Sequence, residues 1–225
     1  MSIVNKDNSK AKILKEVKRE PYIFLNDLSA EARDDKDIVL EAVEQKGWML
    51  GYASERLQND KDVVLEAIKK NGLALEYASE KLRDDKDVIL KAVKQNGLAL
   101  EYASEKLRDD KNVVLEAVKH DGLALMYASE ELQDDKNVVL EAVKQYGRAL
   151  QFASEKLRDD KNVVLEAVKQ NKLALEFASE ELRIDKDIQI AAGIIEPSID
   201  DVIADAKKWC AEHNTPSSDK MELER

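Results

Sequence analysis

The sequence repeats itself every 25 residues. The segment 86–110, KDVILKAVKQNGLALEYASEKLRDD, returns with few changes on both sides. Each full copy begins at a lysine, and a partial copy follows from Lys186; the full copies begin at Lys36, Lys61, Lys86, Lys111, Lys136 and Lys161. A fixed period of about 20 to 50 residues is typical of solenoids, in which each unit exposes an apolar face that only its neighbours can cover. The period therefore predicts a one-dimensional stack.

Composition favours helices along the whole stack. Glycine and proline are scarce, at 7 and 3 residues of 225, and Ala, Leu, Glu and Lys fill most windows. The chain is 44% hydrophobic but also 37% charged, which suits an elongated stack better than one compact globule. We therefore predict an all-α fold, a right-handed α-solenoid of helical hairpins with terminal caps.

The first half of each unit predicts a helix that is covered on two sides. In the segment 86–110 its apolar residues are Val88, Ile89, Leu90, Ala92 and Val93. At about 100° per residue they form a band wider than one core-facing stripe. Asp85 and the equivalent aspartates precede this helix, where a carboxylate can accept hydrogen bonds from the free amides of the first turn.

The end of that helix is predicted at Asn96 and Gly97. Glycine takes the left-handed conformation that closes a helix at no steric cost. Lys172 replaces this glycine in one unit, and there Asn171 would take the left-handed conformation instead.

A second, shorter helix follows the glycine. Its inward-facing residues are predicted to be Leu98, Ala99, Tyr102 and Ala103. Ser104 then predicts the start of one further helical turn, which carries Leu107. Alanines on both helices would let them approach closely, so that a 25-residue unit can hold two.

The chain divides into three parts. We expect a flexible N-terminus at 1–10, one solenoid domain at 11–212 and a disordered polar tail at 213–225. The domain would comprise a degenerate first unit at 11–35, repeats at 36–185 and a C-terminal cap at 186–212. In the cap, Ser198 predicts the start of a final helix that acts as a lid. The apolar face of this helix would be formed by Ile199, Val202, Ile203, Ala206, Trp209 and Cys210.

Three stretches of the repeat carry a resemblance to a known family. They are LKAV at 90–93, GLALEYAS at 97–104 and LRDD at 107–110. They resemble the tandem repeats of a domain-of-unknown-function family, DUF4116, which occurs in secreted effectors of intracellular bacteria and in protist proteins. The resemblance covers 36–185. It has no catalytic residues to carry over, and it implies a helical scaffold for interactions.

Charge and cysteine content restrict the partners and the location. The net charge of −11 opposes binding to a nucleic-acid backbone, and no apolar run predicts a signal peptide or a membrane span. A single cysteine permits no intramolecular disulfide, which is typical of a reducing compartment. We therefore expect a cytoplasmic protein. Because the tail carries Glu222 and Glu224, it resembles a type IV secretion signal, and translocation into a host cell is the alternative.

Neither a catalytic nor a metal-binding cluster is predicted. His120 and His213 have no second ligand or nucleophile beside them in the sequence, and Cys210 is expected to be a small buried hydrophobe. The aspartate runs, such as 84–87, lack the spacing and the glycine of an EF-hand loop. We expect no enzyme activity, no metal and no cofactor.

An aromatic residue recurs in every unit. The series is Tyr52, Tyr77, Tyr102, Tyr127, Phe152 and Phe177. Such a ladder could stack bases in a repeat-type RNA reader. Because Phe replaces Tyr in two units, beside inward alanines, the hydroxyl is dispensable there, and we favour packing in the core.

Two neighbouring units depart from the repeat at outward positions. The departing residues are His120, Asp121, Met126, Tyr146, Arg148 and Gln151. Equivalent positions lie side by side in a solenoid, so these six predict one less acidic patch with residue types that are enriched at interfaces. We call it the predicted patch.

The sequence thus favours a non-enzymatic scaffold that binds another protein, with a monomer as the expected state. A repeat-type nucleic-acid-binding protein and an ordinary cytosolic structural protein are the alternatives.

Overall fold

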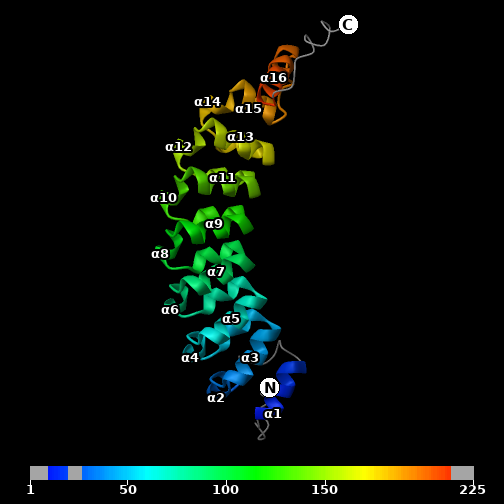
Figure 1. Cartoon of the computed structure of the whole chain (residues 1–225). Helices are drawn as coiled ribbons and strands as arrows, with labels where there is room; N and C mark the ends of the chain where they lie inside the picture. Colours follow the sequence, from blue (N-terminus) through cyan, green and yellow to red (C-terminus); the bar gives the residue numbers. More distant parts are fainter. Residues whose placement is uncertain (1–9, 20–26, 214–225) are drawn as a thin grey trace.

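The computed structural model describes residues 10–19 and 27–213, which form an elongated, curved stack of helices (Figure 1). No strand occurs in these two ranges. The all-α repeat solenoid is confirmed. The residues predicted to be flexible at 1–10 and disordered at 213–225 lie outside the described part, except for Lys10 and His213.

Each repeat consists of three helical elements. The first is a ten-residue α-helix: α3 (Lys36–Gln45), α5 (Lys61–Lys70), α7 (Lys86–Gln95), α9 (Lys111–His120), α11 (Lys136–Gln145) and α13 (Lys161–Gln170). The second is a six-residue 3-10 helix: η1 (Gly47–Tyr52), η2 (Gly72–Tyr77), η3 (Gly97–Tyr102), η4 (Gly122–Tyr127), η5 (Gly147–Phe152) and η6 (Lys172–Phe177). The third is a four-residue α-helix: α4 (Glu55–Gln58), α6 (Glu80–Arg83), α8 (Glu105–Arg108), α10 (Glu130–Gln133), α12 (Glu155–Arg158) and α14 (Glu180–Arg183).

The terminal elements depart from this scheme. At the N-terminal end α1 (Lys10–Arg19) packs against α3, and the four-residue helix α2 (Ala30–Arg33) leads into α3. At the C-terminal end the seventh long helix, α15 (Lys186–Ala191), has only six residues and is followed by α16 (Ile199–Glu212). None of the described helices is long and apolar enough to cross a membrane.

The long helices form the inner wall of the stack. In α7 the predicted cap is present, because Asp85 accepts hydrogen bonds from the amides of Asp87 and Val88. α7 contacts α5 on one side and α9 on the other, so its wide apolar band is covered twice. The side chains that it buries are Val88, Ile89, Ala92 and Val93.

The predicted left-handed turn after this helix is wrong. Asn96 has extended backbone angles, φ −154° and ψ 113°, and Asn171 has nearly the same. In the described ranges the only glycine with a positive φ is Gly193. The repeated glycine is required instead by close packing between successive repeats. A Cβ atom on Gly97 would lie 2.4 Å from the carbonyl oxygen of Ala117 in the next repeat.

The 3-10 helix also changes which side chains reach the core. Three residues per turn replace 3.6. As a result Ala99 and Leu100 are fully buried, whereas Leu98 and Tyr102 are half-buried. The predicted inward set was therefore partly wrong, because it omitted Leu100. The aromatic ladder packs against the core as half-buried rings, apart from the more exposed Tyr52.

Hydrogen bonds connect each repeat to the next. The amide of Ser104, the predicted cap of α8, donates to the carbonyl of Arg83, and its hydroxyl lies 2.6 Å from a carboxylate oxygen of Asp84. In addition, the lysine that begins each long helix pairs with the aspartate that caps the next one. These pairs are Lys36–Asp60, Lys61–Asp85, Lys86–Asp110, Lys111–Asp135, Lys136–Asp160 and Lys161–Asp185. We call this series the Lys–Asp ladder.

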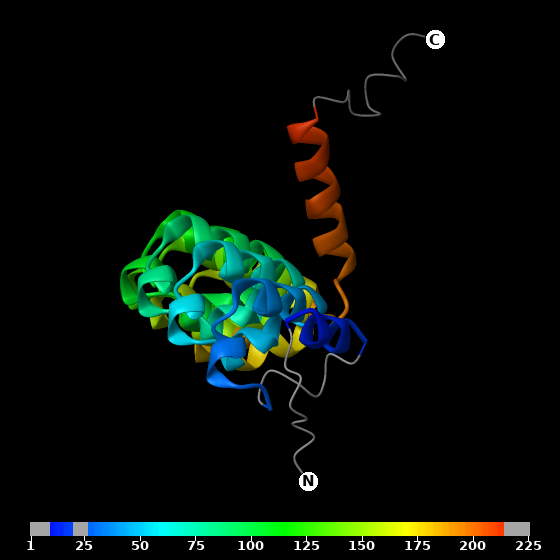
Figure 2. The same cartoon turned by 90° about the horizontal axis from the view of Figure 1, so that it is seen from below.

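The predicted C-terminal lid is wrong. α16 begins at Ser198 with a full capping box, but it buries none of its residues and projects away from the stack (Figure 2). Its described link to the repeats is an ion pair of 2.8 Å between Lys186 and Asp201. Cys210 is exposed and not buried as expected. Of the ten large hydrophobic side chains that are exposed in the described part, eight lie between 173 and 209.

Candidate functional site

The predicted patch lies over η4 and η5, which contact each other. His120 is the exposed last residue of α9, 3.6 Å from Glu116, and Asp121 accepts the amide of Leu123 as the cap of η4. Met126 on η4 is 43% exposed. At the equivalent place on η5, Gln151 donates to the carbonyl of Arg148.

Arg148 turns away from the rest of the patch. Its guanidinium lies 2.8 Å from a carboxylate oxygen of Glu176 and 5.4 Å from the centre of the Phe177 ring, both in the next repeat. Tyr146 is half-buried and packs against the core. Among the six residues, the described hydrogen bonds connect only Arg148 and Gln151. The patch stays a prediction. Within it, Met126 and Gln151 are exposed and occupy equivalent positions on the neighbouring helices η4 and η5.

The structure reveals a second repeated feature that the sequence reasoning missed. The last residue of every short helix carries a long hydrogen-bonding side chain. It is an arginine in five places and a glutamine in two: Arg33, Gln58, Arg83, Arg108, Gln133, Arg158 and Arg183. We call these seven positions the arginine row. It follows the short helices, which line the outer edge of the stack in Figure 1.

Glutamine and arginine behave differently in this row. The amide nitrogen of Gln133 lies 3.0 to 3.5 Å from the carbonyl oxygens of Leu125, Met126 and Ala128, at the end of η4. Gln58 makes the same three contacts to η1 and the residues after it. A 3-10 helix leaves its last carbonyls without intrahelical partners, as an α-helix does, and glutamine satisfies them. The amide nitrogen of each glutamine side chain therefore finds its hydrogen-bond partners within its own repeat.

The arginines are not satisfied in this way. The Nε atoms of Arg83, Arg108 and Arg158 are buried and have no hydrogen-bond partner. Arg83 and Arg108 also have no ion pair with a described residue. Arg158 and Arg183 each have a carboxylate three residues earlier, at 3.9 and 3.8 Å, and those glutamates are almost fully exposed. Exposed pairs at such distances contribute little stability, about 0–1 kcal/mol.

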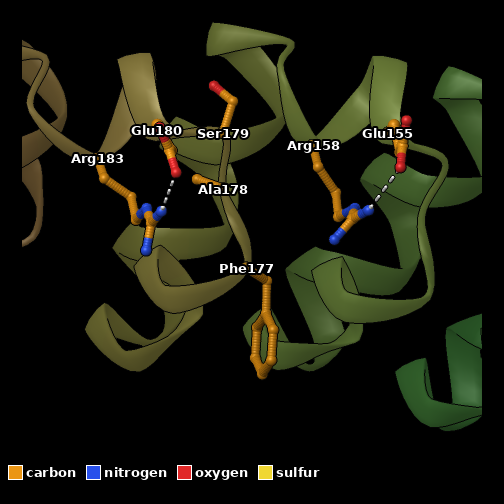
Figure 3. A pocket seen from close by; sticks show the side chains of 7 residues that line it. All are labelled: Glu155, Arg158, Phe177, Ala178, Ser179, Glu180 and Arg183. Carbon is orange, nitrogen blue, oxygen red and sulfur yellow. Dashed lines mark ion pairs between the residues drawn. The ribbon is translucent and has the colours of Figure 1, made fainter.

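A hollow of about 450 Å³ opens between two members of the row. Figure 3 shows Arg158 and Arg183 on either side of the segment that connects η6 to α14. Phe177 and Ala178 lie between them, and Glu155 and Glu180 lie beside the two guanidinium groups. The hollow thus combines two arginine–glutamate pairs with one half-buried aromatic ring. Such a combination can bind an anionic group that carries apolar surface.

The sequence of the stack matches one family. A sequence model described as a domain of unknown function, DUF4116, matches six overlapping segments: 35–83, 60–108, 85–133, 110–158, 135–183 and 160–192. The chain belongs to the DUF4116 family. No curated protein and no solved structure matches it significantly.

The limits of the DUF4116 matches agree with the structural repeat. Every match begins at an aspartate that caps a long helix, and all but the last end at a position of the arginine row. A DUF4116 unit therefore spans two structural repeats and encloses one junction between them. In the sequence, the restriction of this one repeat position to Arg or Gln was the signal that could have identified the row. A single sequence does not show that the two residues differ in hydrogen bonding.

Metal ligands do not cluster in the described ranges. No group of three or more His, Cys, Asp or Glu side chains there could hold a metal ion. His213 stacks on Trp209, with ring centres 4.6 Å apart, and its Nδ1 lies 3.0 Å from the Trp209 carbonyl oxygen. Both histidines thus have local neighbours that account for their positions.

Proposed function

We propose that the protein is a non-enzymatic scaffold that binds another protein along its stack. One observation carries the proposal: the arginine row places a long hydrogen-bonding side chain at the same position of every repeat, along a surface that extends over the whole solenoid. Solenoids bind partners through extended surfaces of this kind. The core is apolar, because no residue with a polar or charged side chain is buried in the described part.

A protein partner fits the charge better than a nucleic acid does. The net charge of −11 would repel a phosphate backbone, and nucleic-acid binding needs clusters of Lys and Arg that displace counterions. The rings of the ladder also pack against the core, which leaves them little free face for stacked bases.

The test is capture followed by reconstitution. The tagged chain is incubated with bacterial and eukaryotic lysates, bound proteins are identified by mass spectrometry, and the best candidate is purified and titrated by calorimetry. A variant that lacks the repeat 111–135 is the control, because removal of one whole period keeps every junction of the stack. We expect saturable binding that this deletion weakens. Tight binding of an oligonucleotide at physiological salt, without a protein ligand, would contradict the proposal.

A further inference from the structure

We infer that the arginine row binds an extended, acidic segment of the partner protein. The inference rests on the proposed function and adds the chemistry of the ligand. It concerns two adjacent pairs of the row, which are Arg83 with Arg108 and Arg158 with Arg183.

The first argument is the state of the arginine side chains. A guanidinium keeps its charge in proteins and carries five N–H donors. A buried donor without a partner is costly, and such groups in a folded protein call for an explanation, such as a ligand that is absent from the structure. Here the Nε atom is left without a partner at Arg33, Arg83, Arg108 and Arg158 of the row, and also at Arg148, which lies outside it. Repetition at equivalent positions indicates a common cause and not a local accident.

The second argument is the contrast with glutamine. Gln58 and Gln133 occupy the same place and bind three backbone carbonyls each. A glutamine at this position therefore satisfies the fold without leaving an unpaired donor. The stack does not need an arginine there for its own hydrogen bonding. The arginines retain donors and positive charge that can serve a ligand.

The third argument is the charge and shape of the hollow between Arg158 and Arg183. A carboxylate accepts two parallel hydrogen bonds from one guanidinium, and such charged bonds are the stronger kind. The glutamates beside the two arginines are exposed and lie 3.8 to 3.9 Å away, so a ligand carboxylate can replace them at little cost. The Phe177 ring supplies apolar surface for the chain that carries the carboxylate.

The spacing of the row favours an extended peptide. Packed helices lie about 8 to 10 Å apart, and an extended chain in the polyproline II conformation rises about 3.1 Å per residue with three residues per turn, so every third side chain lies on one face. Successive repeats should therefore meet every third residue of the ligand. The row reads Arg83, Arg108, Gln133, Arg158 and Arg183, which predicts acidic residues at ligand positions 1, 4, 10 and 13, with a neutral residue opposite Gln133.

A peptide is favoured over a single-stranded nucleic acid at this surface. The aromatic rings beside the row are half-buried, and a Cβ atom on Gly51 would lie 2.8 Å from the Tyr77 ring, so the face of that ring is covered. Each arginine of the two pairs also has a glutamate three residues earlier. A phosphate backbone is charged at every nucleotide and would meet these glutamates as well, whereas a peptide can present neutral residues to them.

The experiment measures the binding of a labelled 13-residue peptide to the full chain by fluorescence anisotropy. The peptide carries Glu at positions 1, 4, 10 and 13 in a Gly, Ser and Ala background. A second peptide has the same composition with its four glutamates adjacent, and a labelled oligothymidine is the third probe. We expect the spaced peptide to bind most tightly, with an affinity that decreases at higher salt.

The chain itself supplies a matched pair of variants. The test variant carries Arg83→Gln, Arg108→Gln and Arg158→Gln, which introduce the side chain that Gln58 and Gln133 show to be compatible with the fold. The control variant carries Lys81→Gln, Lys106→Gln and Lys156→Gln, which remove the same charge from the same helices at exposed positions. We expect the test variant to bind the spaced peptide about tenfold or more weakly, and the control to bind it nearly as the parent does.

Several outcomes would overturn the inference. They are equal binding of the two peptides, equal losses in the two variants, stronger binding of the oligothymidine, or no binding of the spaced peptide by the parent at low salt. If the test variant still captures the lysate partner at full strength, the acidic-segment inference fails and the proposed function stands. If the parent captures no protein at all, the proposed function fails as well.

Discussion

The ammonium group of Lys61 lies 2.6 Å from a carboxylate oxygen of Asp85, the residue that caps the next long helix. The carboxylate of Asp85 thus accepts hydrogen bonds both from amides of the helix that it caps and from a lysine of the preceding repeat. The pKa of Asp85 is lowered, first by the hydrogen bond from Lys61 and also by the amide of Val88, against a partial burial that raises it. The other capping aspartates of the Lys–Asp ladder shift in the same direction, although at Asp60, Asp110 and Asp160 the opposing burial is the largest single influence.

Acid should therefore destabilise the stack. Because these carboxyl groups have a lower pKa in the folded chain than the unfolded value of about 3.9, their stabilisation is present above that pH and is lost as the pH falls through the folded values. We expect a nearly constant melting temperature from about pH 7 to 5 and a steep fall below about pH 4. Circular dichroism on melting at each pH measures this, and an unchanged melting temperature at pH 3 would contradict it.

A matched variant assigns the acid effect to the Lys–Asp ladder. Lys61→Met, Lys86→Met and Lys111→Met together remove the lysine from three junctions and leave the caps in place. The acid-induced fall should become shallower, because the pKa of each aspartate then moves back toward its ordinary value.

Gly97→Ala should destabilise the stack strongly. The added methyl group would meet the carbonyl oxygen of Ala117 at 2.4 Å, and this neighbour is backbone in the next repeat. Overpacking of this kind costs about 1–3 kcal/mol, seen as a lower midpoint in urea. Lys172→Ala is the control at the equivalent place in the last repeat, where the side chain is exposed beside the short α15. It should leave the midpoint unchanged, and equal effects would refute the packing explanation.

Leu100→Ala should cost more than Leu98→Ala. Leu100 is fully buried, whereas Leu98 is half-buried at the surface of the stack. Deletion of a buried leucine side chain costs about 2–5 kcal/mol, and the loss at a half-buried site is smaller. Chemical denaturation of the two variants decides the matter. The reverse order would mean that 97–102 adopts an α-helical register in solution.

Met126→Glu combined with Gln151→Glu tests the predicted patch. Both side chains are exposed, and glutamate is the native residue at the equivalent positions 76, 101 and 176. Stability should stay within about 0.5 kcal/mol of the parent. If the predicted patch binds the partner, capture should fall. Unchanged capture would exclude these two positions from the interface. Tyr146→Ala is a poorer test, because Tyr146 packs against the core.

Truncation after Ser198 should hardly change stability. α16 buries none of its residues, and its described ion pair to the stack is that between Lys186 and Asp201. The pKa of Asp201 is lowered to about 2, first by Lys186 and then by Ser198. Loss of one exposed pair hardly changes the free energy of unfolding. A large drop in the melting temperature would show that α16 packs on the stack in solution.

Local sequence was sufficient for the elements that depend on neighbours in the chain. Asp85 and Ser104 were identified as caps because a capping side chain binds amides two or three residues ahead. The wide apolar band of α7 was recognised from its helical period. The all-α class and the number of full repeats followed in the same way.

Contacts between repeats decided the rest. Gly97 is required because the carbonyl oxygen of a residue 20 positions later in the sequence lies close to it. From the sequence alone, a left-handed turn accounted for a glycine at this position equally well. The lid at 199–212 failed for a related reason: the apolar face of α16 is evident in the sequence, but the sequence does not show whether the last repeat provides a surface for it.

The sequence by itself determined the period, the long helices and their caps, because these depend on interactions within a few residues. Only the tertiary structure decided that 97–102 is a 3-10 helix with Leu100 in the core, and that Arg83, Arg108 and Arg158 have unpaired donors where Gln58 and Gln133 have none. The reason is physical. The burial and the hydrogen bonding of these side chains depend on how successive repeats pack against each other, and the sequence of one 25-residue repeat does not determine that packing alone.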